Sequence, residues 1–371
     1  FLALSGICIH VCTLSSHECL SASSRKSTFN SSLRSEFSRF GTRVSDIVPG
    51  VIDTPMIGKE IRDNLPKSGG FGFLFHATSW DTLNLIFANV PERHQIDESI
   101  LWNTPPFVGS PIYENDKLIG ANIVMPVPID LWISSPRMIK ELRKKQLFPA
   151  LRLAKQCGLN MVALGASTPY ACNYGKLPRP TDDPYITTGH AATAAMLKKW
   201  AIYACQQTDL EFSNIKLAVF GAAGRLGKAV SRYIGYGALP REIILIDLPD
   251  KLNLLKQLAA EIQTQNPQQK LKVSVLGLDT AKPLPKFDGA VLVSNNTVPY
   301  LNADNLRKAR FWIDDSHPRA ASLEAEEATR QDTLYVECYA SAPAGVDTDF
   351  PFNLPTTNDC YTCFAEGYLA W

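Results

Sequence analysis

The sequence predicts an α/β protein with a Rossmann-type doubly wound parallel sheet and a smaller N-terminal α/β substrate domain. Three observations carry this prediction. A short apolar run at 216–220 leads directly into Gly221-Ala-Ala-Gly224-Arg-Leu-Gly227, which opens a helical pattern that continues to about Tyr236. A second apolar run ends in Asp247, 20 residues after Gly227. Four further strand-like runs follow, separated by helical or polar segments as the crossovers of a parallel sheet require. These runs are 272–278, 289–294, 311–314 and 334–337.

Each glycine of the loop has its own expected task. Gly221 lets the chain turn sharply out of the strand, and Gly224 removes a Cβ so that backbone N–H groups can approach a pyrophosphate. Gly227 lets the helix pack closely on the sheet, and the phosphates then meet the positive end of that helix. The alternative is an α/β domain whose glycines only make turns. The other loop residues expected to contact a dinucleotide are Ala222, Arg225 and Leu226.

The acidic residue after the second strand bears on which cofactor is used. Asp247 can accept hydrogen bonds from the ribose hydroxyls, but its charge would repel a 2′-phosphate. The sequence therefore predicts NAD or NADP as the cofactor, with NAD favoured. Ser294 and Asn295 follow the fourth strand and are expected to contact the nicotinamide half.

Composition limits the function classes. With 371 residues and 45% apolar content, the chain is long enough for two domains with ordinary cores. The net charge of +1 provides no field for nucleic acid or an anionic membrane. A basic cluster at 137–145 is interrupted by Glu141, and we expect it to be the solvated face of a helix.

The cysteines do not indicate a disulfide framework. Nine are scattered along the chain, an odd number, and a domain of this size needs no cross-links. Cys360 and Cys363 form a Cys-x-x-Cys pair, but no second pair or neighbouring histidines complete a zinc site. The sequence therefore predicts no metal site and a cytoplasmic protein.

The N-terminal segment at 1–48 differs from the rest of the chain. Its first 14 residues are apolar but too short to span a bilayer, and the part at 15–43 is rich in serine with several basic residues. This composition fits a transit peptide, the remnant of a secretory signal, or upstream sequence read as protein. We expect the segment to be disordered, and a transit peptide would place the protein in an organelle such as the plastid stroma.

The region at 70–190 is expected to form the N-terminal substrate domain. Strands are predicted at 71–75, 118–125 and 161–164, and helices at 81–89 and 138–155. The third strand runs into small hydroxylated residues that include Thr168. Such an end lines a pocket or is an ordinary loop, and both interpretations stay open.

A long helix is predicted from Thr187 to about Gln206, rich in alanine. Its first turn would carry Thr187, Thr188 and His190, which makes the two threonines candidate substrate contacts and His190 a candidate proton carrier. A Rossmann domain is then expected at 191–350. A C-terminal helix at 351–371 is expected to return to the N-terminal domain. The sequence is expected to be truncated after this helix.

Five stretches together resemble the cyanobacterial long-chain acyl-[acyl-carrier-protein] reductases. They keep their order from about residue 70 to the end of the chain. The stretches are Phe71-Gly-Phe-Leu-Phe-His-Ala-Thr-Ser79, Ala163-Leu-Gly-Ala-Ser-Thr168, Thr187-Thr-Gly-His-Ala-Ala-Thr-Ala194, Val219-Phe-Gly-Ala-Ala-Gly-Arg-Leu-Gly227 and Cys363-Phe-Ala-Glu366. The resemblance implies reduction of a fatty acyl thioester to an aldehyde with a nicotinamide cofactor, on a substrate carried by acyl carrier protein.

Two departures from that family suggest altered chemistry. The family's nucleophilic cysteine position is occupied by Gly345, and Cys338, seven residues earlier, is the nearest replacement nucleophile. Asp247 stands where the family carries basic residues suited to a 2′-phosphate.

Without a covalent intermediate, an alcohol/carbonyl couple needs a proton carrier near the carbon that takes hydride. His317, in the loop after the 311–314 run, is a second candidate beside His190. Arg319 in the same loop could bind a carboxylate or phosphate of the substrate, or could pair with Asp314 or Asp315 at the surface.

Three functions therefore follow from the sequence. The first is an NAD(P)-dependent oxidoreductase of the acyl-carrier-protein reductase type. The second is a non-covalent alcohol dehydrogenase like the shikimate and quinate enzymes, and the third is a non-catalytic paralogue that binds a nucleotide or an acyl carrier. The expected partner is a small-molecule or carrier-bound substrate, with no nucleic acid, no membrane insertion and a possible homo-oligomer.

Overall fold

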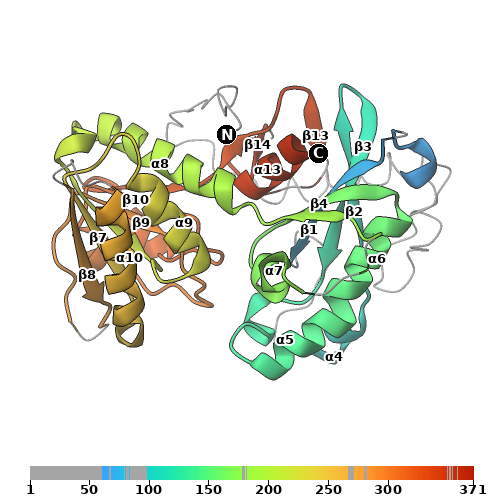
Figure 1. The fold of residues 1–371 in the computed structure, drawn as a ribbon, viewed down its shortest axis with the longest axis horizontal. Coiled ribbons are helices and arrows are strands. Elements are labelled where there is room, and N and C mark those ends of the chain that lie inside the picture. The colour runs from blue at the N-terminus through green and yellow to red at the C-terminus, as the bar shows by residue number, and fades with distance from the viewer. Residues whose placement is uncertain are drawn as a thin grey trace. The chain divides into compact units, whose positions relative to one another are not determined.

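The computed structural model describes residues 61–66, 68–78, 80, 83, 98–177, 180, 182–265, 271–279, 282–348, 350, 352, 354–356 and 358–371. The chain divides into two compact units, which are labelled by element in Figure 1. Unit 1 combines the described residues up to Gly189 with those from Tyr339 to Trp371, and unit 2 comprises the described residues of His190–Cys338. The predicted segment at 1–48 and most of the predicted helix at 81–89 lie outside the described residues.

Unit 2 contains one parallel sheet, sheet B, with the strand order β11-β10-β9-β6-β7-β8. Read from β8, this is chain order 3-2-1-4-5-6, the Rossmann arrangement. All four strands expected after the glycine loop are confirmed. The strands are β6 (Lys216–Phe220), β7 (Glu242–Asp247), β8 (Lys272–Gly277), β9 (Gly289–Leu292), β10 (Phe311–Asp314) and β11 (Leu334–Glu337).

Helices cover sheet B as crossover connections require. The helix α8 (His190–Gln207) packs against α9 (Arg225–Ile234), β9 and β10, while α10 (Leu252–Gln265) packs against β7 and β8. Two short helices complete the crossovers, α11 (Ala303–Leu306) and α12 (Leu323–Glu327), together with single turns at Phe212–Asn214 and Pro249–Lys251. A core of Phe220, Phe287 and Trp312, with ring centroids 5.4–6.0 Å apart, holds one face of the sheet.

Unit 1 contains a mixed sheet, sheet A, with the order β13-β2-β3-β1-β4-β5. The four strands β3, β1, β4 and β5 are parallel, while β2 and β13 add an antiparallel edge. The sequence predicted β1, β3 and β4 and missed the other three. The strands are β1 (Gly70–His76), β2 (Phe107–Glu114), β3 (Lys117–Met125), β4 (Leu159–Leu164), β5 (Tyr185–Thr187) and β13 (Val346–Thr348).

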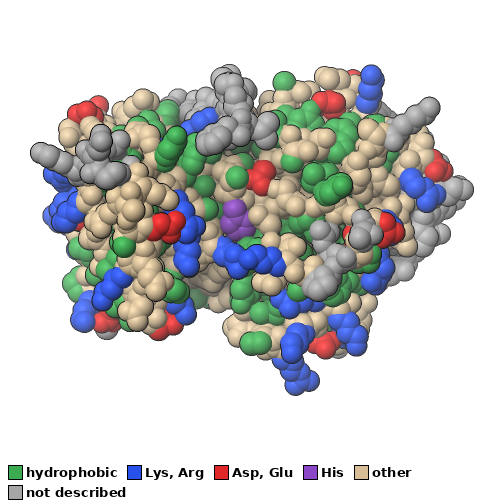
Figure 2. Space-filling model, viewed as in Figure 1, with side chains coloured by type: hydrophobic (Ala, Val, Ile, Leu, Met, Phe, Trp, Pro, Cys, Tyr) green, Lys and Arg blue, Asp and Glu red, His purple; other side chains and the backbone are tan. Residues whose placement is uncertain are grey.

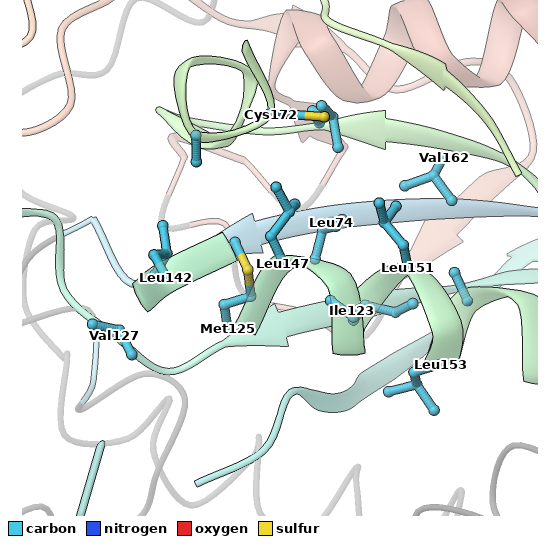
Figure 3. Packing of buried hydrophobic residues seen from close by; sticks show 14 of the residues in the cluster. Leu74, Ile123, Met125, Val127, Leu142, Leu147, Leu151, Leu153, Val162 and Cys172 are labelled. Carbon is cyan, nitrogen blue, oxygen red and sulfur yellow. The ribbon is translucent and has the colours of Figure 1, made fainter. Parts of the chain in front are cut away.

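One face of sheet A is covered by α5 (Pro136–Leu142) and α6 (Phe148–Gln156). Figure 3 shows leucines of these helices, and Leu147 of the turn between them, in one buried cluster with Leu74, Ile123 and Val162 of the strands. The helix predicted at 138–155 is interrupted, because Pro149 has no N–H to donate and the chain passes through a π-helical turn at Arg143–Leu147 before α6 begins. The remaining short elements of this unit are α4 (Glu98–Asn103), α7 (Thr168–Ala171) and the turns Ile129–Leu131 and Asn173–Gly175.

The basic cluster at 137–145 is a solvated helix face, as predicted. Arg137, Lys140, Lys144 and Lys145 are exposed, whereas Ile139 and Leu142 are buried. Figure 2 shows basic side chains over α5 and acidic ones interspersed on the same face of the molecule. This distribution fits the net charge of +1.

The C-terminal segment packs on the other face of sheet A. The helix α13 (Thr362–Ala370) contacts β1, β4 and β5, and a two-stranded ribbon of β12 (Ala340–Ser341) and β14 (Asp359–Cys360) precedes it. Phe364 of α13 lies edge to face against Phe71 and Phe73 of β1, with centroids 5.2 and 5.4 Å apart. Unit 2 ends at Cys338, so residues 339–350, which the sequence assigned to the Rossmann domain, group with unit 1.

Among the described residues, no helix combines the length and the apolarity needed to cross a lipid bilayer. Within the same ranges, no three His, Cys, Asp or Glu side chains come close enough together to hold a metal ion.

Candidate functional site

The glycine turn lies where the strand order of sheet B reverses, between β6 and β9. Gly221 follows β6 with φ +76°, a left-handed conformation that favours glycine. A Cβ there would lie 2.7 Å from the Val293 carbonyl oxygen, directly after β9. A Cβ at Gly227 would lie 2.0 Å from the Gly221 carbonyl oxygen, so Gly227 is required for the helix to pack on the turn. These two glycines have the tasks that the sequence predicted.

Gly224 faces space rather than protein. Within the described part of the chain, a Cβ at this position would have one neighbour within 4 Å, the Gly221 carbonyl oxygen at 3.1 Å. Gly224 is also the N-cap of α9 and has no side chain to cap the first N–H groups of the helix. Open space beside uncapped donors at the positive end of a helix fits a pyrophosphate.

The remaining loop residues surround this space. Arg225 is exposed at the first position of α9, Leu226 is half-buried and Ala222 is buried. The Ala222 N–H donates to the Ile246 carbonyl 3.1 Å away, which ties the turn to β7. Contact of these three residues with a cofactor stays a prediction.

Asp247 ends β7 and its carboxylate holds the glycine turn. Oδ2 accepts a hydrogen bond from the Ala223 N–H at 2.8 Å, and Oδ1 accepts one from the Leu248 N–H at 2.8 Å. Each carboxylate oxygen has a further lone pair, so Asp247 can still accept from ribose hydroxyls. Asp247 is half-buried beside the turn, as the ribose role requires.

Ser294 lies beside the glycine turn, with its amide nitrogen 3.3 Å from where a Gly221 Cβ would stand. Its hydroxyl belongs to a polar network, with Asn296 Oδ1 at 2.9 Å, Tyr300 Oη at 3.1 Å and Ser316 Oγ at 3.1 Å. Burial raises the pKa of Tyr300 above its usual range. Asn295 is exposed, so of the two residues predicted to meet the nicotinamide half, Ser294 is the one fixed in place.

Asp314, at the end of β10, organises the loop that follows. Its buried carboxylate accepts from the Ser316 N–H at 2.8 Å, from the Ala320 N–H at 2.7 Å and from the Tyr335 hydroxyl. Burial raises its pKa, against the lowering effect of those donors. This role was not predicted from the sequence, although an acid at the end of a strand before a turn was a visible signal.

Asp315 and His317 are the titratable groups of that loop. Burial, and next the charge of Asp314, raise the pKa of Asp315 well above its usual range, while a hydrogen bond from Cys338 lowers it. Burial lowers the pKa of His317. Both groups follow the carboxyl end of β10, the edge at which open α/β sheets bind ligands. His317 stays a candidate proton carrier, and Asp315 is a second one that was not predicted from the sequence.

Cys338 and Arg319 have protein partners. Cys338 is 2% exposed directly after β11 and contacts Asp315, so its thiol faces the protein interior. The Arg319 guanidinium lies 2.6 Å from Glu326 and 2.8 Å from Glu337, and it stacks 5.1 Å from the Tyr335 ring centroid. Glu326 and Glu337 take the place of the expected Asp314 and Asp315 as ion-pair partners. A substrate role for Arg319 stays a prediction, but its charge is already compensated.

The threonines predicted to begin the long helix lie before it. Thr187 ends β5 and α8 begins at His190, because Gly189 has φ +73° and breaks the helical path. The Thr187 hydroxyl and the Gly189 N–H both donate to Glu366 Oε1 of α13. Gly189 packs so closely that a Cβ would lie 2.2 Å from Cys363 Cβ. Thr187 and Gly189 of one stretch therefore pack against Cys363 and Glu366 of the other within unit 1.

Three further candidates have known positions but untested roles. His190 is half-buried at the first residue of α8, Thr188 is half-buried just before it, and Thr168 is fully buried at the start of α7. The substrate contacts expected of Thr168 and Thr188 and the proton-carrier role expected of His190 stay predictions.

Gly345 lies in a turn and not in a nucleophile pocket. It has φ +79°, its carbonyl accepts from the Asn115 N–H at 2.8 Å, and a Cβ would lie 2.3 Å from the Asn115 side-chain oxygen. The position that the family comparison assigned to a cysteine is thus one that disfavours any side chain.

Strand order, glycine turn and Asp247 together define unit 2 as a Rossmann-type α/β unit with the features of a dinucleotide site. No family model matches the chain, and no curated protein matches it. Among solved structures, the chain is similar to a chorismate mutase/shikimate 5-dehydrogenase fusion protein from Clostridium acetobutylicum. The two sequences are 13% identical, the match covers 72% of this chain and 85% of the other, and the TM-score is 0.36.

Two other solved structures are similar at the same level. Shikimate 5-dehydrogenase from Listeria monocytogenes, in complex with shikimate and NAD, has 9% identity, covers 74% of this chain and 87% of its own, and gives a TM-score of 0.30. L-tryptophan dehydrogenase from Nostoc punctiforme has 12% identity, covers 72% of this chain and 68% of its own, and gives 0.33. These values are too low to carry a functional argument.

The assignment to the long-chain acyl-[acyl-carrier-protein] reductases is wrong. No family model matches the chain, and the solved structures named above are shikimate and tryptophan dehydrogenases and not reductases of that type. The stretches behind the assignment have local explanations. The glycine loop is common to many dinucleotide enzymes, and two of the other stretches pack on each other through Glu366.

Proposed function

We propose that the protein is an NAD(P)-dependent oxidoreductase that interconverts a small carbonyl compound and its alcohol without a covalent intermediate. The observation that carries the proposal is the open space at Gly224, beside the uncapped N-terminus of α9 and at the switch point of a 3-2-1-4-5-6 sheet. A nicotinamide cofactor bound there would supply or accept the hydride.

The residues around the turn have separate tasks in this proposal. The N–H groups at the start of α9 bind the pyrophosphate, and Asp247 accepts from the ribose hydroxyls while it holds the Ala223 N–H. Because a second negative charge at the 2′-position would lie against Asp247, NAD is favoured over NADP.

We expect the loop after β10 to handle the proton. Asp315, whose pKa is raised, keeps its proton to higher pH than an exposed aspartate does, and His317, whose pKa is lowered, is favoured in the neutral form that can accept a proton. Asp314 keeps this loop in one conformation through three hydrogen bonds. A nucleophilic thiol is not needed, which agrees with the burial of Cys338.

Turnover assays test the proposal. Purified protein is mixed with NADH or NADPH and a panel of ketones, aldehydes and 2-oxo acids, and with the oxidised cofactors and alcohols for the reverse reaction. We expect oxidation of NADH on at least one carbonyl compound and none by a Gly224→Val variant. Cofactor binding without turnover on any compound would support a nucleotide-binding protein instead, and absence of binding would remove the proposal altogether.

A further inference from the structure

Sheet A has a switch point of its own. Its parallel strands have the spatial order β3-β1-β4-β5, so the chain leaves β1 towards β3 on one side and leaves β4 towards β5 on the other. Connections that diverge in this way leave a crevice outside the carboxyl ends of the two central strands. In unit 1 this edge carries His76 at the end of β1, Trp132 after β3 and Thr168 after β4.

Two buried donors at this edge have no hydrogen-bond partner among the residues that the structure describes. Trp132 Nε1 and Thr168 Oγ1 are enclosed, both residues are 0% exposed, and neither atom has an acceptor within those ranges. A buried polar group without a partner destabilises the folded state, because it has lost its hydrogen bonds to water. Folded proteins retain few such groups, and functional sites are where they are tolerated.

His76 links the two residues. Its ring lies edge to face against Trp132 with centroids 5.1 Å apart, and its Nε2 lies 3.1 Å from the Ser167 N–H, next to Thr168. Because Nε2 accepts from an amide, the ring proton is on Nδ1, which donates to the Ala77 carbonyl at 2.7 Å. His76 is therefore a neutral positioning residue that holds the Ser167–Thr168 loop.

The chemistry of the edge limits what it binds. Indole N–H is a donor only, and a threonine hydroxyl can donate, so the two groups suit an oxygen acceptor. Asp130, two residues before Trp132, accepts from Trp80 Nε1 at 3.0 Å and adds a negative charge at the same edge. A carboxylate would be repelled there, whereas a neutral ketone, aldehyde, amide or alcohol oxygen would not.

We infer that this edge of sheet A, where Trp132 and Thr168 offer buried donors beside His76, is the site that binds a neutral oxygen of the substrate. That the bound molecule is a substrate rests on the proposed oxidoreductase function. The location of the binding site rests on unit 1 alone. It extends the sequence prediction for Thr168, adds Trp132 and His76, and specifies a neutral acceptor.

The test uses a threonine pair. Thr168→Val keeps the shape of the side chain and removes the unpartnered hydroxyl, so the ligand-free melting temperature should stay level or rise. Thr329→Val is the matched control, because its buried hydroxyl donates to the Ala325 carbonyl at 3.0 Å, and this variant should melt lower. A fall for Thr168→Val as large as that for Thr329→Val would show a hydroxyl that is already satisfied, and would overturn the inference.

Binding is measured directly with matched probes and without cofactor. Ligand-detected NMR with cyclohexanone, cyclohexanol and cyclohexanecarboxylate should show binding of the two neutral probes and not of the carboxylate. Thr168→Val and Trp132→Phe should each weaken that binding at least ~10-fold, which is about 1.4 kcal/mol, and Thr329→Val should not. Equal binding by all variants, preference for the carboxylate, or no binding of any probe would overturn the inference.

The two proposals fail separately. If NADH does not bind but cyclohexanone binds in a manner sensitive to Thr168→Val, the oxidoreductase proposal fails and the site remains. If a carbonyl substrate is turned over and both variants keep its wild-type KM, the site fails and the oxidoreductase proposal remains.

Discussion

The carboxyl edges of the two sheets offer hydrogen-bond donors of different kinds. At the edge of sheet B the donors belong to the backbone, in a turn where Gly224 leaves space and Gly227 allows close packing. At the edge of sheet A they belong to the side chains of Trp132 and Thr168, which are enclosed and held beside His76. A site built from backbone N–H groups needs glycines, and a pattern of glycines can be recognised in a sequence. A site built from buried side chains has no such pattern.

The largest expected effect is at the backbone site. In Gly227→Ala, the new methyl group would lie 2.0 Å from the Gly221 carbonyl oxygen and 2.7 Å from Ala222 Cα. The turn must move, so we expect a loss of about 1–3 kcal/mol of unfolding free energy and no measurable NADH binding. Urea unfolding and NADH fluorescence check this, and wild-type affinity in the variant would show that the turn does not hold the cofactor.

The second effect is a pH dependence of stability that comes from the protonation of Asp315 in the loop after β10. Burial and Asp314 raise the pKa of Asp315, so the folded protein keeps a proton that the unfolded chain releases above about pH 4. The stability tied to this proton is present at low pH and is lost as pH rises through the folded-state pKa. A pKa that differs by one between the folded and unfolded states changes the unfolding free energy by about 1.4 kcal/mol.

Asp315→Asn should therefore be more stable than wild type at pH 8, with a gap that closes towards pH 4. Urea unfolding across this range measures the gap. Asp304→Asn, at an exposed carboxylate of α11, is the control and should follow wild type. Parallel curves for wild type and Asp315→Asn would contradict the raised pKa.

A third change separates the two nucleotides. Asp247→Asn removes the charge that would face the ribose and weakens the acceptor of the Ala223 N–H. We expect NADH binding to weaken about 10-fold, or about 1.4 kcal/mol, the lower end for a hydrogen bond to a charged group, and NADPH binding to improve relative to it. Competition titrations measure the ratio, and an unchanged ratio would place the ribose elsewhere.

The smallest effect is expected in unit 1. Thr187→Val removes the hydroxyl that donates to Glu366, and should cost about 1 kcal/mol of unfolding free energy. The neighbouring Thr188→Val is the control and should cost less. NADH affinity should be the same in both variants, and a selective loss of affinity in Thr187→Val would return Thr187 to the functional candidates.

The sequence predicted sheet B well because its signals are local. Apolar runs of four to seven residues bounded by glycine or polar turns became β6 to β11, and Asp247 lies at the end of β7 as predicted. The antiparallel edge of sheet A was not predictable in the same way. Pairing of β13 with β2 joins residues 346–348 to 112–114, and no local pattern encodes so distant a partner.

The sequence predicted the backbone geometry of the glycine turn, and it did not predict the partners of the buried polar side chains. Gly221 makes the turn and Gly227 allows the close packing that the sequence predicted. Arg319, however, forms ion pairs with Glu326 and Glu337, and the Thr187 hydroxyl donates to Glu366. Side chains of this type are chosen by contacts that form only after the chain has folded. The resemblance to the acyl-[acyl-carrier-protein] reductases was misleading for the same reason, because stretches of similar sequence can reflect packing contacts and not a common function.

Calorimetric titration of NADH into wild-type protein and into Gly224→Val is the decisive experiment for the dinucleotide site. The variant places a side chain in the space beside the uncapped end of α9, where its Cβ would meet the Gly221 carbonyl oxygen. We expect binding to wild type, no binding to Gly224→Val, and a melting temperature of the variant that is only slightly lower than that of wild type. Absence of heat with wild type, or equal affinity in the variant, would refute a cofactor site at this turn.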